Sequence, residues 1–458
     1  MTFRAVRYKM ERMNRAQIAI YTLGCKVNQQ ESASLARELG RMGFALVPPG
    51  SPADAYVINS CTVTRAADSR TRQRIRQARA HAPGAIIAVI GCYPQVAAEE
   101  LARMDEVDLV VTSEEKERTA EILAAALTKR GRGADLVRSG EAIPGALGGR
   151  TRAYVKIEDG CDRNCAYCVI PLARGRVRSR LPEEVIRDVE LLLENGYKEL
   201  VVTGINMALY GRDLGMKDGL YSLLERLCAI GGRADESGFR EYRLRLGSLE
   251  PTVIDAEAVS RIACLPRICP QFHLSLQSGC GRILRAMGRP YAPQDYHAIL
   301  RALRGTDPRF AVTTDVIVGF PGETEEDFEE SHAFVEQAEF ARVHVFRYSR
   351  RPGTAAASMP DQVPAASAAE RCRRMTATAK RSMSGYLEGC IGQVRRTLLF
   401  GPDKSGRGIL GVTDTGIDVC VPLAMLPMPG AGAANAFVDL MLERNIFAAS
   451  SGFPASSE

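Results

Sequence analysis

The sequence predicts an α/β protein in three parts: an N-terminal doubly wound parallel-sheet domain, a central partial (βα)6 TIM-like barrel and a small C-terminal antiparallel β-barrel. Three observations predict this fold class. Short apolar runs alternate with helical periodicity over residues 17–130, a second such series starts at residue 153, and residues 391–445 hold short strand-like runs alone. A chain of 458 residues has room for two to four domains.

The composition is that of a soluble globular protein, with 46% hydrophobic and 25% charged residues. A net charge of +6 permits a nucleic-acid partner without requiring one. The basic N-terminus lacks an apolar core, and no run of about 18 apolar residues occurs, so we expect neither a signal peptide nor a membrane span. Thirteen cysteines without a secretion signal indicate a reducing compartment, and we therefore expect a cytoplasmic protein.

The expected N-terminal domain, residues 15–132, is a βαβ series. Four apolar runs have the pattern of buried strands, at 17–22, 55–60, 85–91 and 107–111. Helical spacing follows the first three runs, at 31–42, 66–80 and 95–103. This alternation predicts a parallel, doubly wound sheet. The glycine-rich residues 133–150 have no periodicity and are expected to form a linker.

Three cysteines occupy equivalent places in this series. Cys25 follows the first strand, Cys61 the second and Cys92 the third. Because parallel strands end on the same edge of a sheet, the three side chains are expected to converge there. At that edge they could hold a metal cluster, in addition to the one that the barrel cysteines described below could hold. The alternative is that each cysteine is a small buried apolar residue.

The helix expected after Cys61 carries six arginines, without acidic partners at helical spacing. We expect it to contact the phosphates of an RNA, and the alternative is a solvated helix face. The six are Arg65, Arg70, Arg72, Arg74, Arg76 and Arg79.

The barrel is expected over residues 151–362, where six apolar runs alternate with helical patterns. The runs lie at 153–158, 198–204, 242–248, 272–277, 312–320 and 342–349. The helical patterns lie at 182–195, 220–230, 254–263, 294–303 and 325–337. Sites in such barrels lie at the carboxyl ends of the strands. Ser248, Glu250 and Gln277 fall at these ends, where polar residues either bind a ligand or form turns.

A cysteine loop follows the first barrel strand. Cys161, Cys165 and Cys168 are spaced Cys-x3-Cys-x2-Cys, so three thiolates can cap three corners of an iron–sulfur cube and leave the fourth iron open to a small molecule. A zinc site usually takes four ligands, and no Cys or His lies within twenty residues after Cys168 to complete one.

The C-terminal part is expected to be a connecting helix at 363–388, a β domain at 389–447 and a disordered tail at 448–458. The β domain has few cations for an RNA groove, which usually needs more. They include Arg395, Arg396, Lys404 and Arg407.

The residues around these cysteines resemble a known family. IEDGCDRNCAYC followed by VIPLARGRVRSR resembles the signature of radical S-adenosylmethionine (SAM) enzymes, and more narrowly that of the methylthiotransferases. GCKVNQQES, NSCTVTRAADSRTRQRIR and GCYPQ resemble the three cysteine motifs of that family's N-terminal domain. The resemblance implies two 4Fe-4S clusters, one on Cys161, Cys165 and Cys168 that binds SAM, and an auxiliary one on Cys25, Cys61 and Cys92.

The resemblance extends to cofactor contacts and to the C-terminal part. It implies that Tyr167 meets the adenine of SAM, with Ser248, Glu250 and Gln277 as further SAM contacts. The β domain matches in position the TRAM domain that binds RNA in this family. A one-electron reductant such as flavodoxin or ferredoxin is also implied, whereas the sulfur donor is unknown.

The implied reaction uses a 5′-deoxyadenosyl radical from SAM to replace a C–H bond with a methylthio group. GCKVNQQES and TGINMALYGRDLG resemble the subgroup that acts at C2 of N6-threonylcarbamoyladenosine, in the anticodon stem-loop of a tRNA. The alternatives are isopentenyladenosine in tRNA, a ribosomal-protein aspartate, a non-catalytic iron–sulfur RNA-binding protein and a zinc-bound structural protein.

Overall fold

The computed structural model describes residues 15–132, 151–231, 241–251, 253–426 and 434–448. The expected linker at 133–150 lies outside these residues, as does nearly all of the expected C-terminal tail. No helix in the described ranges is long and apolar enough to cross a membrane.

The first domain is a five-stranded parallel sheet in the order β2-β1-β3-β4-β5. Apolar residues alternate between its two faces: Ile18 and Ile20 join one core cluster, and Ala19 joins the other. Helices cover both faces, which explains why the strands are continuous apolar runs. The strands are β1 Gln17–Thr22, β2 Ala45–Val47, β3 Ala55–Ser60, β4 Ile86–Gly91 and β5 Leu109–Val110. The helices are α2 Lys26–Arg41, α3 Arg65–His81, α4 Cys92–Ala102 and α5 Thr119–Lys129.

The central part is a partial barrel of parallel strands in two sheets, β10-β9-β6 and β11-β12-β13-β14. The third predicted strand divides at Gly247, so that β10 pairs with β9 and β11 pairs with β12. The strands are β6 Arg152–Lys156, β9 Glu199–Thr203, β10 Arg243–Leu246, β11 Ser248–Leu249, β12 Gln271–Leu274, β13 Ala311–Val318 and β14 Arg342–Arg347. The helices around them are α7 Pro182–Glu194, α8 Gly219–Ala229, α9 Ala256–Ala263, α10 Gly281–Ala286, α11 Pro293–Thr306 and α12 Glu325–Gln337.

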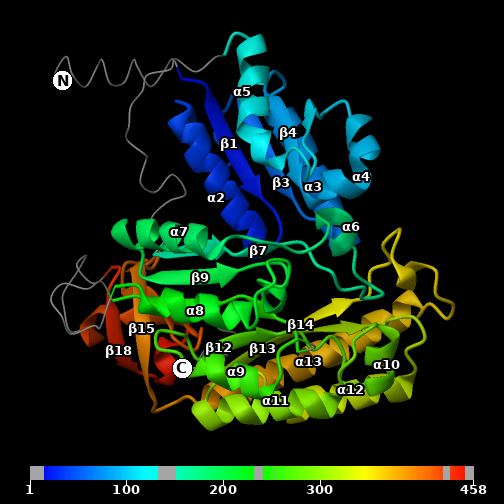
Figure 1. Cartoon of the computed structure of the whole chain (residues 1–458), viewed down its shortest axis with the longest axis vertical. Helices are drawn as coiled ribbons and strands as arrows, with labels where there is room; N and C mark the ends of the chain where they lie inside the picture. The colour runs from blue at the N-terminus through cyan, green and yellow to red at the C-terminus, as the bar shows by residue number, and fades with distance from the viewer. Residues whose placement is uncertain (1–14, 133–150, 232–240, 252, 427–433, 449–458) are drawn as a thin grey trace.

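Between β6 and α7 the chain forms the short elements β7 (Glu158–Asp159), α6 (Ile170–Arg174) and β8 (Arg178–Ser179). The first domain stands on this end of the barrel, with α2 packed on β6 and α4 on α6 (Figure 1). The carboxyl ends of the barrel strands therefore face the edge of the first sheet.

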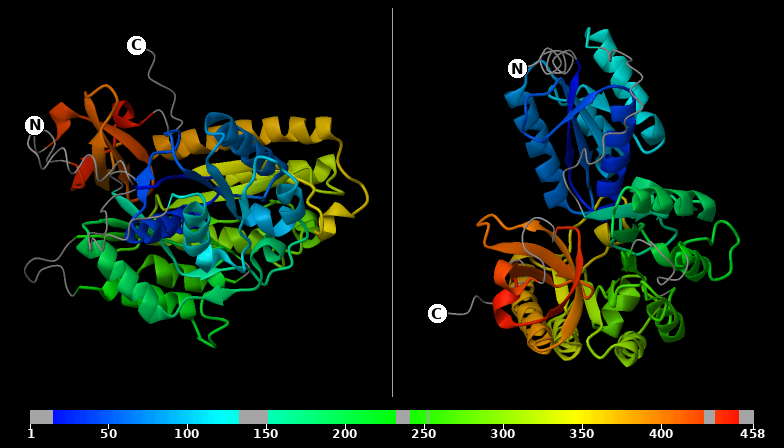
Figure 2. Two further views of the ribbon diagram at one scale, coloured as in Figure 1. Left: turned by 90° about the horizontal axis from the view of Figure 1, so that it is seen from above. Right: turned by 90° about the vertical axis from the view of Figure 1, so that its left-hand side faces the viewer.

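The C-terminal sheet is antiparallel, in the order β17-β16-β15-β18, and follows the long helix α13 (Ala365–Glu388). Figure 2 shows this sheet, in orange and red, beside the barrel. Its strands are β15 Val394–Pro402, β16 Gly408–Thr413, β17 Asp418–Pro422 and β18 Phe437–Met441. Together the three parts confirm the predicted fold class.

Candidate active site

The loop of Cys161, Cys165 and Cys168 connects β7 to α6 and is held by backbone hydrogen bonds. The amide of Cys161 donates to the carbonyl of Gly175 at 3.0 Å, and that of Cys168 donates to Cys165 at 3.0 Å. Burial, together with the neighbouring Cys165 and Cys161, raises the pKa of the Cys168 thiol to about 12. The three half-buried sulfurs therefore share one space.

A buried polar group lies against this loop. Glu250 accepts hydrogen bonds from Arg289 and Asn206, and from Arg163 at 3.2 Å. The hydroxyl of Tyr167 accepts a hydrogen bond from Arg289 at 2.9 Å. Two predicted SAM contacts, Tyr167 and Glu250, are thus joined by Arg289, which sequence reasoning did not single out.

The other two predicted SAM contacts, Ser248 and Gln277, lie on β11 and just after β12, which are neighbouring strands. Ser248 is half-buried on β11, where it pairs in register with His273. Gln277 is 8% exposed and has a φ of 68°. Its backbone N–H donates to the backbone carbonyl of Asp315 at 2.8 Å. In the described part of the chain, neither side chain is hydrogen-bonded to Tyr167 or Glu250.

The three N-terminal cysteines lie at the carboxyl ends of β1, β3 and β4, which are neighbours in the sheet. Gly24, with a φ of +111°, packs so closely that a Cβ there would lie 2.7 Å from the Cβ of Cys61 and 3.3 Å from its Sγ. Burial raises the pKa of the Cys92 thiol to about 12, and Cys61 and Cys25 add to the shift. The strand ends therefore bring the three cysteines toward one place.

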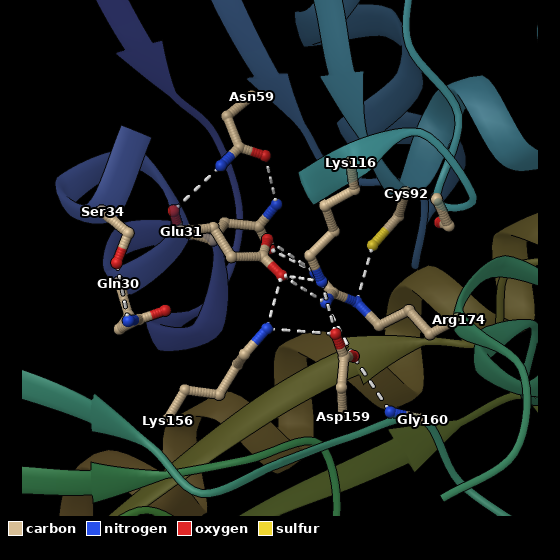
Figure 3. Close-up of polar contacts among 12 residues, drawn as sticks. Gln30, Glu31, Ser34, Asn59, Cys92, Lys116, Lys156, Asp159, Gly160 and Arg174 are labelled. Carbon is tan, nitrogen blue, oxygen red and sulfur yellow. Dashed lines mark hydrogen bonds and ion pairs between the residues drawn. The ribbon is translucent and has the colours of Figure 1, made fainter. Parts of the chain in front are cut away.

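Arg174, the last residue of α6, lies between Cys92 of the first domain and Asp159, which precedes the barrel's cysteine loop (Figure 3). Its Nε donates to the Sγ of Cys92 at 3.1 Å, and its Nη1 donates to Asp159 and to Glu31, each at 2.9 Å. The Arg174 side chain is only 5% exposed. One guanidinium thus contacts a cysteine of the first domain and the segment just before the barrel's cysteine loop.

Two lysines complete this network. Lys116 lies 2.7 Å from Glu31 and 2.5 Å from Asp159, and Lys156 lies 3.2 Å from each carboxylate. Although burial opposes it, the cations around Glu31 lower the pKa of that carboxyl to about 2. The same cations hold the pKa of Asp159 well below its usual range against the effect of burial. Both acids are therefore ionised at neutral pH.

A cavity of about 960 Å³ opens between the first domain and the barrel beside this network. Its walls come from both sides, with Gln30 and Asn59 from the first domain and Arg178 and Asp188 from the barrel. The cavity is large enough for a small ligand by the usual volume range.

A second contact joins the two domains near Cys61. Arg351, which follows β14, forms an ion pair with Asp68 at 2.6 Å and donates to the hydroxyl of Thr62 at 2.7 Å. The Arg351 side chain is 6% exposed. The cysteine edge of the first domain is therefore fixed on two sides, by Arg174 and by Arg351.

Lys26 is the first residue of α2, the helix that packs on β6 of the barrel. It is adjacent to Cys25, and its ammonium makes no hydrogen bond or ion pair with any residue that the structure describes. Burial, followed by the charges of Arg245 and Arg152, lowers the pKa of Lys26 to about 8, against the opposing effect of Glu199. Lys26 is thus a cation without an ion-pair partner among the described residues, and it stays mainly protonated at neutral pH.

The arginine helix α3 differs from expectation. Three of its arginines have acidic partners on other elements, at 3.2 Å for Arg72 and Glu100, 3.9 Å for Arg76 and Glu106, and 2.5 Å for Arg79 and Asp108. Arg74 lies over the ring of Tyr21, 4.7 Å from its centroid. The expectation that acidic partners are missing was therefore wrong for half of the six arginines, because helical spacing reports only partners on the same helix.

Comparison with known proteins identifies the family. The family model "Uncharacterized protein family UPF0004" matches residues 17–112, and the model "Radical SAM superfamily" matches residues 155–335. The threonylcarbamoyladenosine tRNA methylthiotransferase MtaB of Thermotoga maritima is 38% identical over 83% of this chain and 86% of its own length. The chain belongs to the radical SAM tRNA methylthiotransferase family.

Other relatives show the breadth of this family. The protein of the same name from Bacillus subtilis is 38% identical over 81% of this chain and 82% of its own length. A tRNA-2-methylthio-N(6)-dimethylallyladenosine synthase from Caldicellulosiruptor saccharolyticus is 35% identical, with 86% of this chain and 84% of the relative covered. A radical SAM methyltransferase structure, TsrM from Kitasatospora setae, has a TM-score of 0.52 at 14% identity over 75% of this chain and 77% of its own, which supports the fold alone.

Membership in this family implies SAM and a 4Fe-4S cluster, and the barrel loop fits both. Its donors are three thiols on one loop, the ligand type that such clusters take. Asn206 donates through Nδ2 to the Sγ of Cys161 at 3.8 Å, and its buried Oδ1 has no partner among the described residues. An acceptor is thus left beside Cys161 for an amino group such as that of SAM.

The N-terminal donors are three thiols, the ligand type that a 4Fe-4S cluster takes. Across the described ranges, no group of three or more His, Cys, Asp or Glu side chains is arranged to hold one metal ion. A four-iron cluster takes each thiolate on a different iron, so its ligands stand farther apart than those of one ion. The close approach of Gly24 to Cys61 leaves the space between the strand ends free of side chains at that position.

Proposed function

We propose that this protein is a radical SAM methylthiotransferase that adds a methylthio group at C2 of N6-threonylcarbamoyladenosine, beside the anticodon of a tRNA. Among related substrates, the choice rests on one observation: the unpartnered ammonium of Lys26 beside the N-terminal cysteines. The threonylcarbamoyl group carries a carboxylate, whereas the dimethylallyl group is a hydrocarbon. A cation in this position favours the substrate with the negative charge.

The names of the relatives do not separate these two substrates. Relatives named for threonylcarbamoyladenosine are 38% identical, and one named for dimethylallyladenosine is 35% identical over a similar share of the chain. Such a small difference does not decide a substrate. The charge around Lys26 also supports the choice, because two arginines, Arg152 and Arg245, act on it against one carboxylate, Glu199.

We assign Cys161, Cys165 and Cys168 to a 4Fe-4S cluster that binds SAM. We assign Cys25, Cys61 and Cys92 to a second cluster. When bound, these groups supply the radical, the sulfur and the methyl group. The chain's own residues prepare the site: Arg289 fixes Tyr167 and Glu250 in place beside the loop. A one-electron reductant such as flavodoxin or ferredoxin belongs to the proposal.

The test is mass spectrometry of tRNA nucleosides from a strain that lacks the protein. The proposal expects 2-methylthio-N6-threonylcarbamoyladenosine to disappear and to return with the wild-type chain. Its unchanged level in the deletion strain would overturn the substrate. Loss of the methylthio group from isopentenyladenosine, or from a ribosomal-protein aspartate, would assign the enzyme to that substrate instead.

Substitution of Lys26 tests the observation directly. With purified reconstituted enzyme and tRNA, Lys26→Gln should lower kcat/KM about 10- to 100-fold, because a hydrogen bond to a charged group contributes about 1.5–3 kcal/mol. Lys26→Arg keeps the charge and should retain more activity. Equal losses in the two variants would contradict a role for the charge. Absence of 5′-deoxyadenosine from the wild-type enzyme supplied with SAM and a reductant would exclude catalysis altogether.

A further inference from the structure

The attachment of the first domain to the barrel does not by itself explain the hydrogen bond from Arg174 to the sulfur of Cys92. Arg351 joins the same two domains through Asp68 and Thr62, and it reaches no sulfur in the described structure. Arg174 instead directs one N–H group to the Sγ of Cys92, at 3.1 Å. Both side chains of this N–H···S contact are buried: Cys92 is 3% exposed and Arg174 is 5% exposed.

The group of charges around Arg174 has an excess of positive charge. Three cations, Arg174, Lys116 and Lys156, meet two carboxylates, Glu31 and Asp159. All three cations share the two carboxylates, so three positive charges against two negative ones leave the group with a net positive charge. An arginine keeps its proton under all conditions in which proteins fold. The charge next to Cys92 is therefore permanent.

Hydrogen bonds and positive charge at a cysteine ligand change the redox properties of a cluster. One-electron reduction adds a negative charge to the cluster. An N–H donor and a cation beside a ligand sulfur stabilise this reduced state more than the oxidised one. The reduction potential accordingly rises.

We propose that Arg174 is a positioning residue that holds Cys92 and raises the reduction potential of the N-terminal cluster. The inference rests on the proposed assignment of Cys25, Cys61 and Cys92 to that cluster. Since Arg174 belongs to the helix that follows the SAM-binding loop, the same side chain keeps the ligand of one cluster in a fixed position relative to the loop of the other.

The experiment uses the full chain with Cys161, Cys165 and Cys168 replaced by alanine, so that only the N-terminal cluster is loaded. Reduction is followed by electron paramagnetic resonance during a potentiometric titration, with iron per chain measured on each sample. Arg174→Gln should shift the midpoint to a more negative potential. Arg351→Gln, the matched control, removes the other buried interdomain arginine and should leave the midpoint near that of the parent.

A second variant shifts the potential in the opposite direction. Glu31→Gln removes one carboxylate beside Arg174, so the net positive charge rises and the midpoint should become more positive. If Arg174 and Glu31 had only structural roles, the two substitutions would not be expected to shift the midpoint potential in opposite directions. If Arg174→Gln fails to load iron, the test depends on Glu31→Gln alone. An unchanged or more negative midpoint potential in Glu31→Gln then overturns the proposal.

The remaining outcomes separate this proposal from the assignment of the cluster. If the parent chain binds no iron after reconstitution, the assignment of Cys25, Cys61 and Cys92 to a cluster is wrong. The role proposed for Arg174 is then wrong as well. A loaded parent whose midpoint equals that of Arg174→Gln overturns the role of Arg174 and leaves the cluster in place. The tRNA nucleoside measurement is independent of both results.

Discussion

Glu158 is a buried carboxyl group next to the barrel's cysteine loop, and its surroundings keep it neutral. The residue is 0% exposed. Its Oε1 accepts a hydrogen bond from the amide of Asn206 at 2.5 Å, whereas its buried Oε2 has no partner among the residues that the structure describes. Burial raises the pKa of Glu158 to about 8. At neutral pH the group is therefore a hydrogen-bond donor as well as an acceptor.

The pKa of Glu158 is 4.5 in the unfolded chain and about 8 in the folded chain. We predict that the apoprotein loses stability as the pH rises from the first of these values through the second. The neutral form contributes stability that is fully present below the unfolded pKa and is lost above the folded one. Urea denaturation over a series of pH values measures this loss. Glu158→Gln should abolish this part of the pH dependence, and an equal decline in that variant would contradict the prediction.

The cysteines could be found from the sequence, but their partners could not. Each cysteine follows a strand, and the strand pattern alone places it at the carboxyl edge. Arg289 reaches Tyr167 and Glu250 across long sequence separations, and no local pattern indicates such a contact. The arginines of α3 show the same limit, since Glu100, the partner of Arg72, lies on α4.

Helix α2 begins five residues earlier than the apolar spacing predicts, at Lys26 instead of residue 31. Its first turn lies at the domain interface, where polar residues take the place of the apolar ones on which helical periodicity depends. Cys25 is consequently the N-cap residue of the helix.

Gly24 should be essential for this arrangement. Gly24→Ala would place a Cβ 2.7 Å from the Cβ of Cys61 at a φ of +111°, which strains the backbone and separates the cysteines. We predict a loss of about 1–3 kcal/mol in the free energy of unfolding, together with a loss of iron from the N-terminal cluster. Urea denaturation and iron analysis measure the two effects.

Gly40, within the helix that follows Gly24, is the control. A Cβ at Gly40 meets nothing within 4 Å, so Gly40→Ala should stabilise the chain by about 0.5–1 kcal/mol through helix propensity. Retention of iron in both alanine variants would contradict a special role for Gly24.

The strands of the barrel were largely predictable, whereas the break in the third one was not. The apolar run at 242–248 continues through Gly247 without interruption in its pattern. The structure nevertheless divides it between two sheets at that glycine. Apolar periodicity reports which residues are buried, and it does not report which neighbour a strand pairs with.

The barrel and the C-terminal sheet are joined by one fully buried carboxylate. Glu199 is 0% exposed and lies 2.9 Å from Arg152, 2.6 Å from Arg243 and 3.0 Å from Arg245. The two arginines on β10 donate in turn to backbone carbonyls of the C-terminal sheet, including that of Val412. The docking of the third domain therefore depends on charges inside the second.

We predict that Glu199→Gln destabilises the folded chain by about 3–5 kcal/mol, because it leaves buried arginines without their counter-ion. Urea denaturation measures the loss. The matched control is Glu241→Gln, which removes a partner of Arg396 at the surface of the same interface, with the two side chains 50% and 39% exposed. That loss should stay below about 1 kcal/mol, and equal losses in the two variants would contradict the prediction.

Two cations of the C-terminal sheet are engaged within the chain, whereas Lys404 and Arg407 are exposed. Arg395 pairs with Asp307 at 2.6 Å, and Arg396 pairs with Glu241 at 2.6 Å. This agrees with the expectation that few cations here are available to an RNA. The order of the three parts could be read from periodicity, but their interfaces consist of polar contacts that no periodic pattern reveals.

The two-sided attachment of the first domain has a consequence for biosynthesis. A chain that grows from its N-terminus completes the first sheet, with Cys25, Cys61 and Cys92, before Arg174 and Arg351 have been translated. Cys92 acquires its arginine donor only when residue 174 has emerged, and the Cys61 side of the sheet is closed only after residue 351. Until residue 174 emerges, the three cysteines of the nascent protein therefore lack both arginine contacts that enclose this edge in the folded chain.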